Sequence, residues 1–232
     1  MSEHTRWAGV AAAAATIAVM AAGCGNGSSS GSGSNSLASK TPSQIVAAAE
    51  SAIKGATSYE ISGSGTTSTG VTSFDLKVVN ADISGSFVLN GATIAMVEVA
   101  SNIYIKAPAS FYTAAGASAA GAGLLGSAWV EIPASSSYAS DFSSLSSITD
   151  LTSKLSSTTD TFTSDGTGNV DGQSVVFLKD ATNGDVVAIA TSGPAYPLQV
   201  KETGGSTAGT YDLSNWNSVA TFTAPPNPVT LP

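Results

Sequence analysis

The side chains that most often carry catalysis are confined to the first residues of this 232-residue chain. There is one histidine, His4, one cysteine, Cys24, and one arginine, Arg6. Histidine serves as general base and zinc ligand, a cysteine thiolate serves as nucleophile, and arginine grips phosphates and carboxylates. Beyond Cys24, chemistry would have to rest on lysines, carboxylates and tyrosines, which form no convincing constellation. We therefore expect no enzyme activity, no metal site and no cofactor.

A glycine motif occurs near the middle of the chain. Gly121-Ala-Gly123-Leu-Leu-Gly126 matches the dinucleotide pattern G-x-G-x-x-G. That pattern needs a strand before it and a helix after it, within a βαβ unit, and no strand leads into this one. A flexible loop or lid is the better interpretation.

Clustered oxygens near residue 183 could suggest calcium. Asp180, Asn183 and Asp185 surround a turn, but the 12-residue loop with its terminal glutamate is missing. Asn183-Gly184 between apolar strands predicts a type I′ hairpin instead.

The remaining charged candidates are dispersed. Asp141, Asp150 and Asp160 could suggest paired carboxylates for glycoside hydrolysis, but their spacing does not place them on one helical face. Lys106 and Lys201 could contact an anionic headgroup, although single lysines in separate strands are more often surface charges. Because arginine is absent beyond residue 6, headgroup selectivity is expected to be weak.

The composition excludes nucleic acid as a partner. Asp and Glu number 16 against 8 Lys and Arg, a net charge of −8, whereas phosphate binding needs clustered basic residues. Charged residues make up only 10% of the chain, but the hydrophobic fraction is 42%, so the chain should fold. We expect one domain with one core.

The N-terminus resembles a bacterial export signal. Trp7–Ala22 is an uncharged run of 16 residues, shorter than the roughly 20 that span a membrane. It ends in Ala21-Ala22-Gly23-Cys24, which resembles the lipobox whose cysteine is acylated after cleavage. We expect residues 1–23 to be a lipoprotein signal peptide and 24–40 a lipidated Cys24 with a Gly/Ser tether. The alternative is an ordinary secretory signal with an incidental cysteine.

The single domain is expected over residues 41–232. It opens at Thr41-Pro42-Ser43-Gln44, a capping box that starts a helix of about 14 residues. After this helix, apolar residues recur at every second position, which predicts antiparallel strands joined by short turns. The strands are expected at Tyr59–Ser68, Val71–Val79, Asp82–Leu89, Ala92–Ala100 and Asn102–Lys106.

The second half repeats this pattern after an insertion. A brief strand at Trp129–Ile132 and an amphipathic helix over Phe142–Leu155 are predicted between Pro108 and Ser157. A second meander follows, over Thr161–Val170, Ser174–Asp180, Asp185–Thr191, Pro197–Thr203 and Ser206–Leu213, with a closing strand near Ser218–Thr223. With no βαβ alternation, this layout predicts an α+β fold in which one curved antiparallel sheet carries helices on one face.

An apolar sheet face is the remaining candidate for a working surface. It is either a closed core or a partly open cleft that accepts acyl chains, and patterning does not separate the two. The residues expected to line it are Ile53, Phe74, Leu76, Val78, Phe87, Leu89, Ile94, Met96, Ile105, Leu145, Leu151, Phe177 and Ile189.

The order of elements resembles the LppX/LprG-like lipoproteins of actinobacteria. The resemblance rests on the lipobox Cys24, the Gly/Ser tether, the strand Asn102–Lys106, and Tyr196-Pro197-Leu198 entering a strand. It also rests on Tyr211–Trp216 followed by Pro225.

The resemblance implies a LolA/LolB-like half-open antiparallel β-barrel whose helices pack over its concave face. It implies a hydrophobic cavity for the acyl chains of lipids or lipoglycans, carried or presented at the extracytoplasmic face of the cell membrane. Membrane attachment would run through acylated Cys24, and an export partner remains unidentified. The alternative is a non-carrier envelope lipoprotein that acts as a sensor or interaction module on the same fold.

Overall fold

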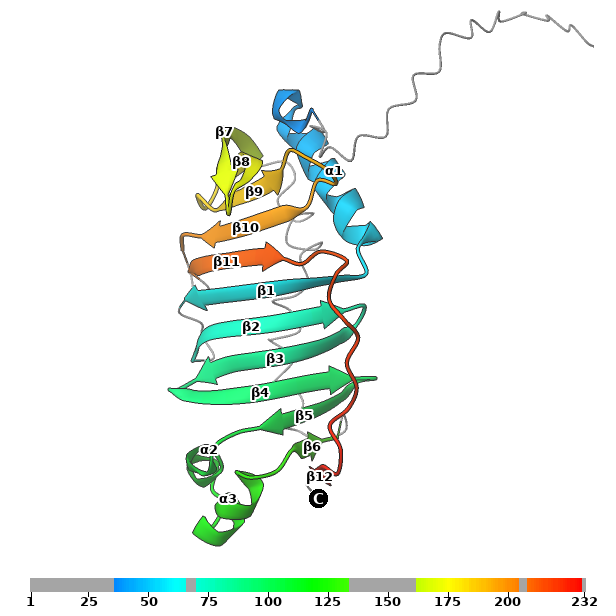
Figure 1. The fold of residues 1–232 in the computed structure, drawn as a ribbon. Helices are drawn as coiled ribbons and strands as arrows, with labels where there is room; N and C mark the ends of the chain where they lie inside the picture. The colour runs from blue at the N-terminus through cyan, green and yellow to red at the C-terminus, as the bar shows by residue number, and fades with distance from the viewer. Residues whose placement is uncertain (1–35, 66–69, 134–161, 205–207, 231–232) are drawn as a thin grey trace, which may run out of the picture. The chain divides into compact units, whose positions relative to one another are not determined.

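The computed structural model describes residues 36–65, 70–133, 162–204 and 208–230 (Figure 1). The chain divides into Met1–Gly31 and Ser32–Pro232, and all described residues belong to the second part. Cys24 and the predicted helix over Phe142–Leu155 lie outside the described residues.

The folded part begins before the predicted boundary at residue 41. The short 3-10 helix η1 (Leu37–Ser39) lies within the expected tether, and Leu37 is only 3% exposed. Leu37 is the first large apolar side chain after the Gly/Ser run, so its burial joins the end of that run to the core.

The helix α1 (Pro42–Gly55) begins where the sequence predicts. The Thr41 hydroxyl accepts a hydrogen bond from the Gln44 amide, and the Gln44 side chain accepts one from the Thr41 amide at 3.1 Å. Pro42 at the first helical position costs no hydrogen bond. The buried side chains Ile45, Val46 and Ala49 lie on one face of α1.

A twelve-stranded open sheet forms the rest of the fold, in the spatial order β12-β6-β5-β4-β3-β2-β1-β11-β10-β9-β8-β7. Every neighbouring pair is antiparallel except β12 and β6. Its strands are β1 (Ser58–Gly65), β2 (Val71–Val79), β3 (Asp82–Leu89), β4 (Ala92–Val99), β5 (Asn102–Lys106), β6 (Val130–Ile132), β7 (Phe162–Val170), β8 (Gln173–Asp180), β9 (Val186–Ala190), β10 (Pro197–Glu202), β11 (Gly209–Ser214) and β12 (Val229–Thr230).

The predicted α+β layout with an open curved sheet and helices on one face is confirmed. Two meanders, β1–β5 and β7–β11, are joined where β1 pairs with β11. The turns Asn90-Gly91 and Asp171-Gly172 have positive φ at both residues, as type I′ hairpins require.

Three local predictions are wrong. No strand forms over Ser218–Thr223, and the chain pairs again only at β12. The G-x-G-x-x-G string is not a flexible loop, because it forms most of the helix α3 (Ala119–Leu125), capped by the Ser118 hydroxyl. Asn183-Gly184 is not a type I′ turn, because only Gly184 has positive φ.

The segment between β11 and β12 is an extended strap. It begins beside β1, where Val219 donates to the Ser58 hydroxyl, and ends at β6, so it crosses β2 to β5 (Figure 1). From β1 to β6 there are five spacings between neighbouring strands, which amount to about 24 Å. The ten residues 219–228 cover this distance at about 3 Å per residue. Every third side chain is half-buried, which is the period of a polyproline II segment: Val219, Phe222, Pro225 and Pro228. Asn227, with φ of 50°, makes a bend shortly before β12.

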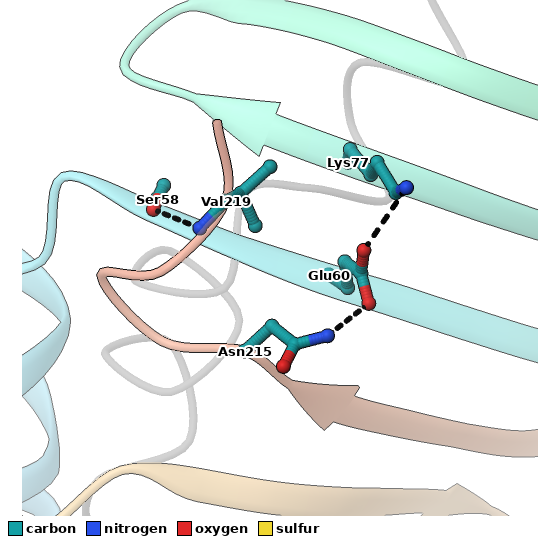
Figure 2. A network of polar contacts seen from close by, with 5 residues as sticks. All are labelled: Ser58, Glu60, Lys77, Asn215 and Val219. Atoms are coloured by element: carbon teal, nitrogen blue, oxygen red, sulfur yellow. Dashed lines mark hydrogen bonds and ion pairs between the residues drawn. The ribbon is translucent and has the colours of Figure 1, made fainter. Parts of the chain in front are cut away.

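Polar contacts fasten the start of the strap to β1 and β2. Asn215 donates through its side-chain amide to the Glu60 carboxylate, whose other oxygen lies 3.3 Å from the Lys77 ammonium (Figure 2). The Asn217 amide donates to the Ser58 carbonyl at 2.7 Å. These bonds fix where the chain leaves β11 and enters the strap.

The two faces of the sheet follow from its register. Leu213, Ile61, Leu76, Gly85 and Met96 are successive cross-strand partners and share one face. We call it the helix-bearing face, because α1, α2 (Ala109–Ala114) and α3 pack on it through Ile45, Tyr112 and Ala122. The other face carries Glu60 and Lys77 and is called the opposite face.

Candidate functional site

The helix-bearing face is apolar along nearly the whole sheet. On β1 to β6 and β11 it forms a first core cluster, in which Leu76 and Ile94 are fully buried. The members of the first cluster are Tyr59, Ile61, Val71, Phe74, Leu76, Val78, Ile83, Phe87, Ile94, Met96, Ile103, Ile105, Ala107, Tyr112, Ala122, Val130, Ile132, Tyr211 and Leu213.

A second core cluster continues this face under α1 and η1. Its members are Leu37, Ile45, Val46, Ala49, Val176, Leu178, Val187, Ile189 and Ala195. Ile53 and Val200 pack against both clusters, so the two form one apolar surface running from β6 to β8.

The structure brings most of the predicted lining residues together. Phe74, Leu76, Val78, Phe87, Ile94, Met96 and Ile105 are buried in the first cluster, with Ile53 and Leu89 packed against it. Ile189 lies in the second cluster. Leu145, Leu151 and Cys24 lie outside the described residues.

Phe177 does not share this face. It pairs in register with Ala188, whereas its neighbour Val176 pairs with Ile189, and adjacent residues of a strand point to opposite faces. Phe177 packs against a third core cluster on the opposite face, made of Val170, Val175, Ala188, Ala190 and Leu198. The opposite face of β7 to β10 is therefore not the wet surface that alternation predicts.

An aromatic stack lies where the chain leaves β11, and the residue pattern alone does not predict it. Trp216 stacks on Tyr196 with ring centroids 4.4 Å apart and on Tyr59 at 4.9 Å. Asn217 donates to the Tyr196 hydroxyl at 2.7 Å and accepts from the Thr57 amide at 2.7 Å. Tyr196 and Trp216 both come from the motifs that carry the family resemblance.

The oxygens considered for calcium accept hydrogen bonds from the protein itself. The Asp180 carboxylate accepts from the Thr182 amide, and the Asn183 side chain accepts from the Asp185 amide. The Asp185 carboxylate accepts from the Thr203 amide at 2.8 Å. Over residues 36–65, 70–133, 162–204 and 208–230 there is no group of three histidine, cysteine or acidic side chains arranged to hold a metal.

Buried tyrosines make the stability sensitive to alkali. Burial raises the pKa of Tyr104, Tyr112 and Tyr211, and for Tyr104 the nearby Glu131 carboxylate raises its pKa further. Above about pH 10 the unfolded chain releases these phenolic protons and the folded chain keeps them, so ionisation stabilises the unfolded state.

We therefore expect the free energy of unfolding to fall as the pH rises above about 10 and to be insensitive to these groups below it. Urea unfolding followed by fluorescence at a series of pH values measures this. Tyr211→Phe should flatten the alkaline decline, whereas the exposed-lysine control Lys179→Gln should not. An unchanged decline in Tyr211→Phe would contradict the assignment.

A pocket of about 570 Å³ opens at one end of the sheet. It lies between the β3–β4 turn, the end of β5 and the helices α2 and α3, and among the described residues of its lining Lys106 is the charged one. Among the described residues, no helix is both long and apolar enough to cross a membrane.

Comparison with known proteins identifies the fold. No family model and no curated protein matches the chain. Among solved structures it is similar to the lipoprotein LppX of Mycobacterium tuberculosis, with a TM-score of 0.55 and 19% identity over 78% of this chain and 97% of that one. It is also similar to LprF from Mycobacterium bovis, with a TM-score of 0.58 and 16% identity over 81% and 97% of the two chains.

These likenesses define the class: the chain has an α+β open curved-sheet fold. It is the fold of LppX and LprF, so the resemblance drawn from the sequence is confirmed at the level of the fold.

Proposed function

We propose that this protein is an extracytoplasmic lipoprotein that binds the acyl chains of a lipid or lipoglycan along its helix-bearing face. Residues 1–23 act as the signal peptide, and acylated Cys24 attaches the protein to the cell membrane. The folded domain then carries or presents the bound lipid, and no catalysis is involved. The fold that it shares with the lipoprotein LppX supports this proposal.

The observation that carries the proposal is the continuity of the apolar surface. The first and second clusters join through Ile53 and Val200 and so offer one apolar strip across most of the sheet. Covering each methylene of an acyl chain is worth about 0.8 kcal/mol, so a chain of a dozen carbons on this strip offsets much of the cost of leaving a bilayer.

Access to this surface requires movement. Side chains such as Leu76 and Ile94 are fully buried. The described helices on this face are short: α1 has 14 residues, α2 has 6 and α3 has 7. We propose that acyl chains enter where these helices separate from the sheet. Short helices are stabilised mainly by packing of one face, so a ligand that covers the sheet can replace those contacts.

Lipid binding is tested with the chain in which Cys24 is replaced by serine. Native mass spectrometry should show co-purified lipid, and a fluorescent fatty acid should bind saturably. Ile53→Gln should weaken fatty-acid binding several-fold, because half-buried Ile53 on α1 packs against both clusters and an amide there replaces apolar contact surface with a polar group. The matched control is Lys54→Gln, the neighbouring exposed residue.

Two results separate this proposal from the alternative. Saturable fatty-acid binding that Ile53→Gln weakens and Lys54→Gln leaves intact supports the carrier. A chain that purifies without lipid and takes up no fatty acid has its interior filled by side chains, which favours a sensor or interaction module on the same fold.

A further inference from the structure

The pocket at the β5 end of the sheet is built from three separate parts of the chain. The β3–β4 turn and the start of β4 supply Asn90 and Thr93, the end of β5 and the start of α2 supply Lys106 and Ser110, and Gly126 follows α3. Its volume of about 570 Å³ is in the range of small-molecule sites.

The lining of this pocket favours a negative charge. Lys106 contributes an ammonium, Asn90 an amide, and Thr93 and Ser110 hydroxyls, and the part of the lining that the structure describes includes no carboxylate. This absence is notable in a chain with 16 acidic residues and 8 basic ones. The donors available here are those that proteins use toward phosphates and carboxylates.

Lys106 is exposed and free for a ligand. Lys54 lies 3.8 Å from Glu50, and Lys77 lies 3.3 Å from Glu60. Among the described residues, no acidic group lies within ion-pair distance of Lys106. An incoming anion would therefore not compete with an internal carboxylate for this ammonium.

The pocket adjoins the apolar surface. Ala107, which follows Lys106, is 3% exposed and belongs to the first cluster, and Leu89, which precedes Asn90, packs against that cluster. Lys106 pairs with Ala95, and Thr93 precedes Ala95 by two residues, so both side chains leave the sheet on the opposite face. The pocket therefore meets the helix-bearing face at the strand ends, through Ala107 and Leu89. An amphiphile can place its acyl part on that face and its head in the pocket without burying a charge in the core.

We propose that this pocket binds the anionic headgroup, a phosphate or carboxylate, of the amphiphile whose acyl chains the helix-bearing face covers, with Lys106 as the cation. The inference rests on the proposed function and adds the class of headgroup. It implies charge selectivity, in contrast to the weak headgroup selectivity expected from the sequence, because a lysine among neutral donors discriminates charge without an arginine.

The test compares two soluble lipids with the same short acyl chains, dihexanoyl phosphatidylglycerol and dihexanoyl phosphatidylcholine, and glycerol 3-phosphate as a head without chains. Binding to the full chain is measured by calorimetry. Lys106→Gln should weaken phosphatidylglycerol binding about tenfold, since a hydrogen bond to a charged group is lost, and leave phosphatidylcholine binding unchanged. Lys201→Gln, an exposed lysine outside the pocket, should change neither.

Each result bears on one of the two proposals. Equal binding of both lipids, unaffected by Lys106→Gln, overturns the headgroup site and leaves lipid binding standing. Binding of glycerol 3-phosphate that depends on Lys106, with no binding of either lipid, supports an anion site and overturns the lipid carrier. Failure of all three ligands to bind overturns both.

Discussion

Replacing Phe87 by alanine is expected to lower the free energy of unfolding by about 3–5 kcal/mol, because it leaves a large cavity in a well-packed core. The Phe87 ring is 2% exposed and lies in register between Phe74 of β2 and Ile94 of β4. Three adjacent strands would lose packing together, so little can collapse to fill the space. Urea unfolding of Phe87→Ala and the parent chain measures the difference.

Phe177→Ala is the matched control, since it deletes the same side chain from the opposite face. Phe177 is half-buried, and its ring lies over Gly168 of β7. We expect a loss of about 1–2 kcal/mol, because part of this ring is already in water. A loss from Phe177→Ala equal to that from Phe87→Ala would contradict the view that the helix-bearing face is the principal core.

These two phenylalanines also mark where sequence reasoning succeeds and where it ends. On β2, buried Phe74, Leu76 and Val78 alternate with exposed Asp75 and Lys77, so the strand bounds and the buried face were predicted correctly. Asn90-Gly91 likewise predicted the turn between β3 and β4, because asparagine and glycine tolerate positive φ.

On β8 the same reasoning fails, because Val175, Val176, Phe177 and Leu178 are all apolar. A strand that is buried on both faces has no alternation, and only pairing with β9 assigns its faces. The strand predicted over Ser218–Thr223, within the strap, is wrong for a related reason. The strap's half-buried residues recur at every third position, whereas a strand with one buried face has them at every second position. The prolines at 225, 226 and 228 also lack the amide hydrogens that a sheet ladder needs.

The lipid-facing role that we propose for the predicted lining residues could not be derived from their pattern either. The sequence pattern around Leu76 is the same whether this residue packs against a side chain or against an acyl chain, because both are hydrocarbon. One residue of the pocket could be named from the sequence, because Lys106 was already a candidate for contact with an anionic headgroup. Its neutral neighbours come from residues 90–93 and 110, which only the fold brings beside it.

Gly85→Ala is expected to destabilise the protein by about 3 kcal/mol or more, because the added methyl group meets backbone that cannot move aside. Gly85 lies at the centre of β3, opposite Leu76 of β2 and Met96 of β4. A Cβ there would overlap the Asp75 carbonyl oxygen and lie 2.9 Å from the Leu76 Cα. A glycine lets β2 and β3 approach closely at the middle of the apolar surface.

Two other glycines serve as comparisons for Gly85→Ala in the same urea experiment. Gly123→Ala, inside α3 with open space around it, should leave stability unchanged or raise it by up to about 1 kcal/mol. Gly63→Ala should cost an intermediate amount, about 1–2 kcal/mol, because a Cβ there lies 2.5 Å from the Tyr211 ring, a side chain, and the nearest backbone atom on a neighbouring strand is the Thr210 carbonyl oxygen, 3.0 Å away. If Gly85→Ala were no worse than Gly63→Ala, β2 and β3 would be able to separate locally. The centre of the helix-bearing face would then be a place where the sheet itself yields to a ligand, in addition to its helices.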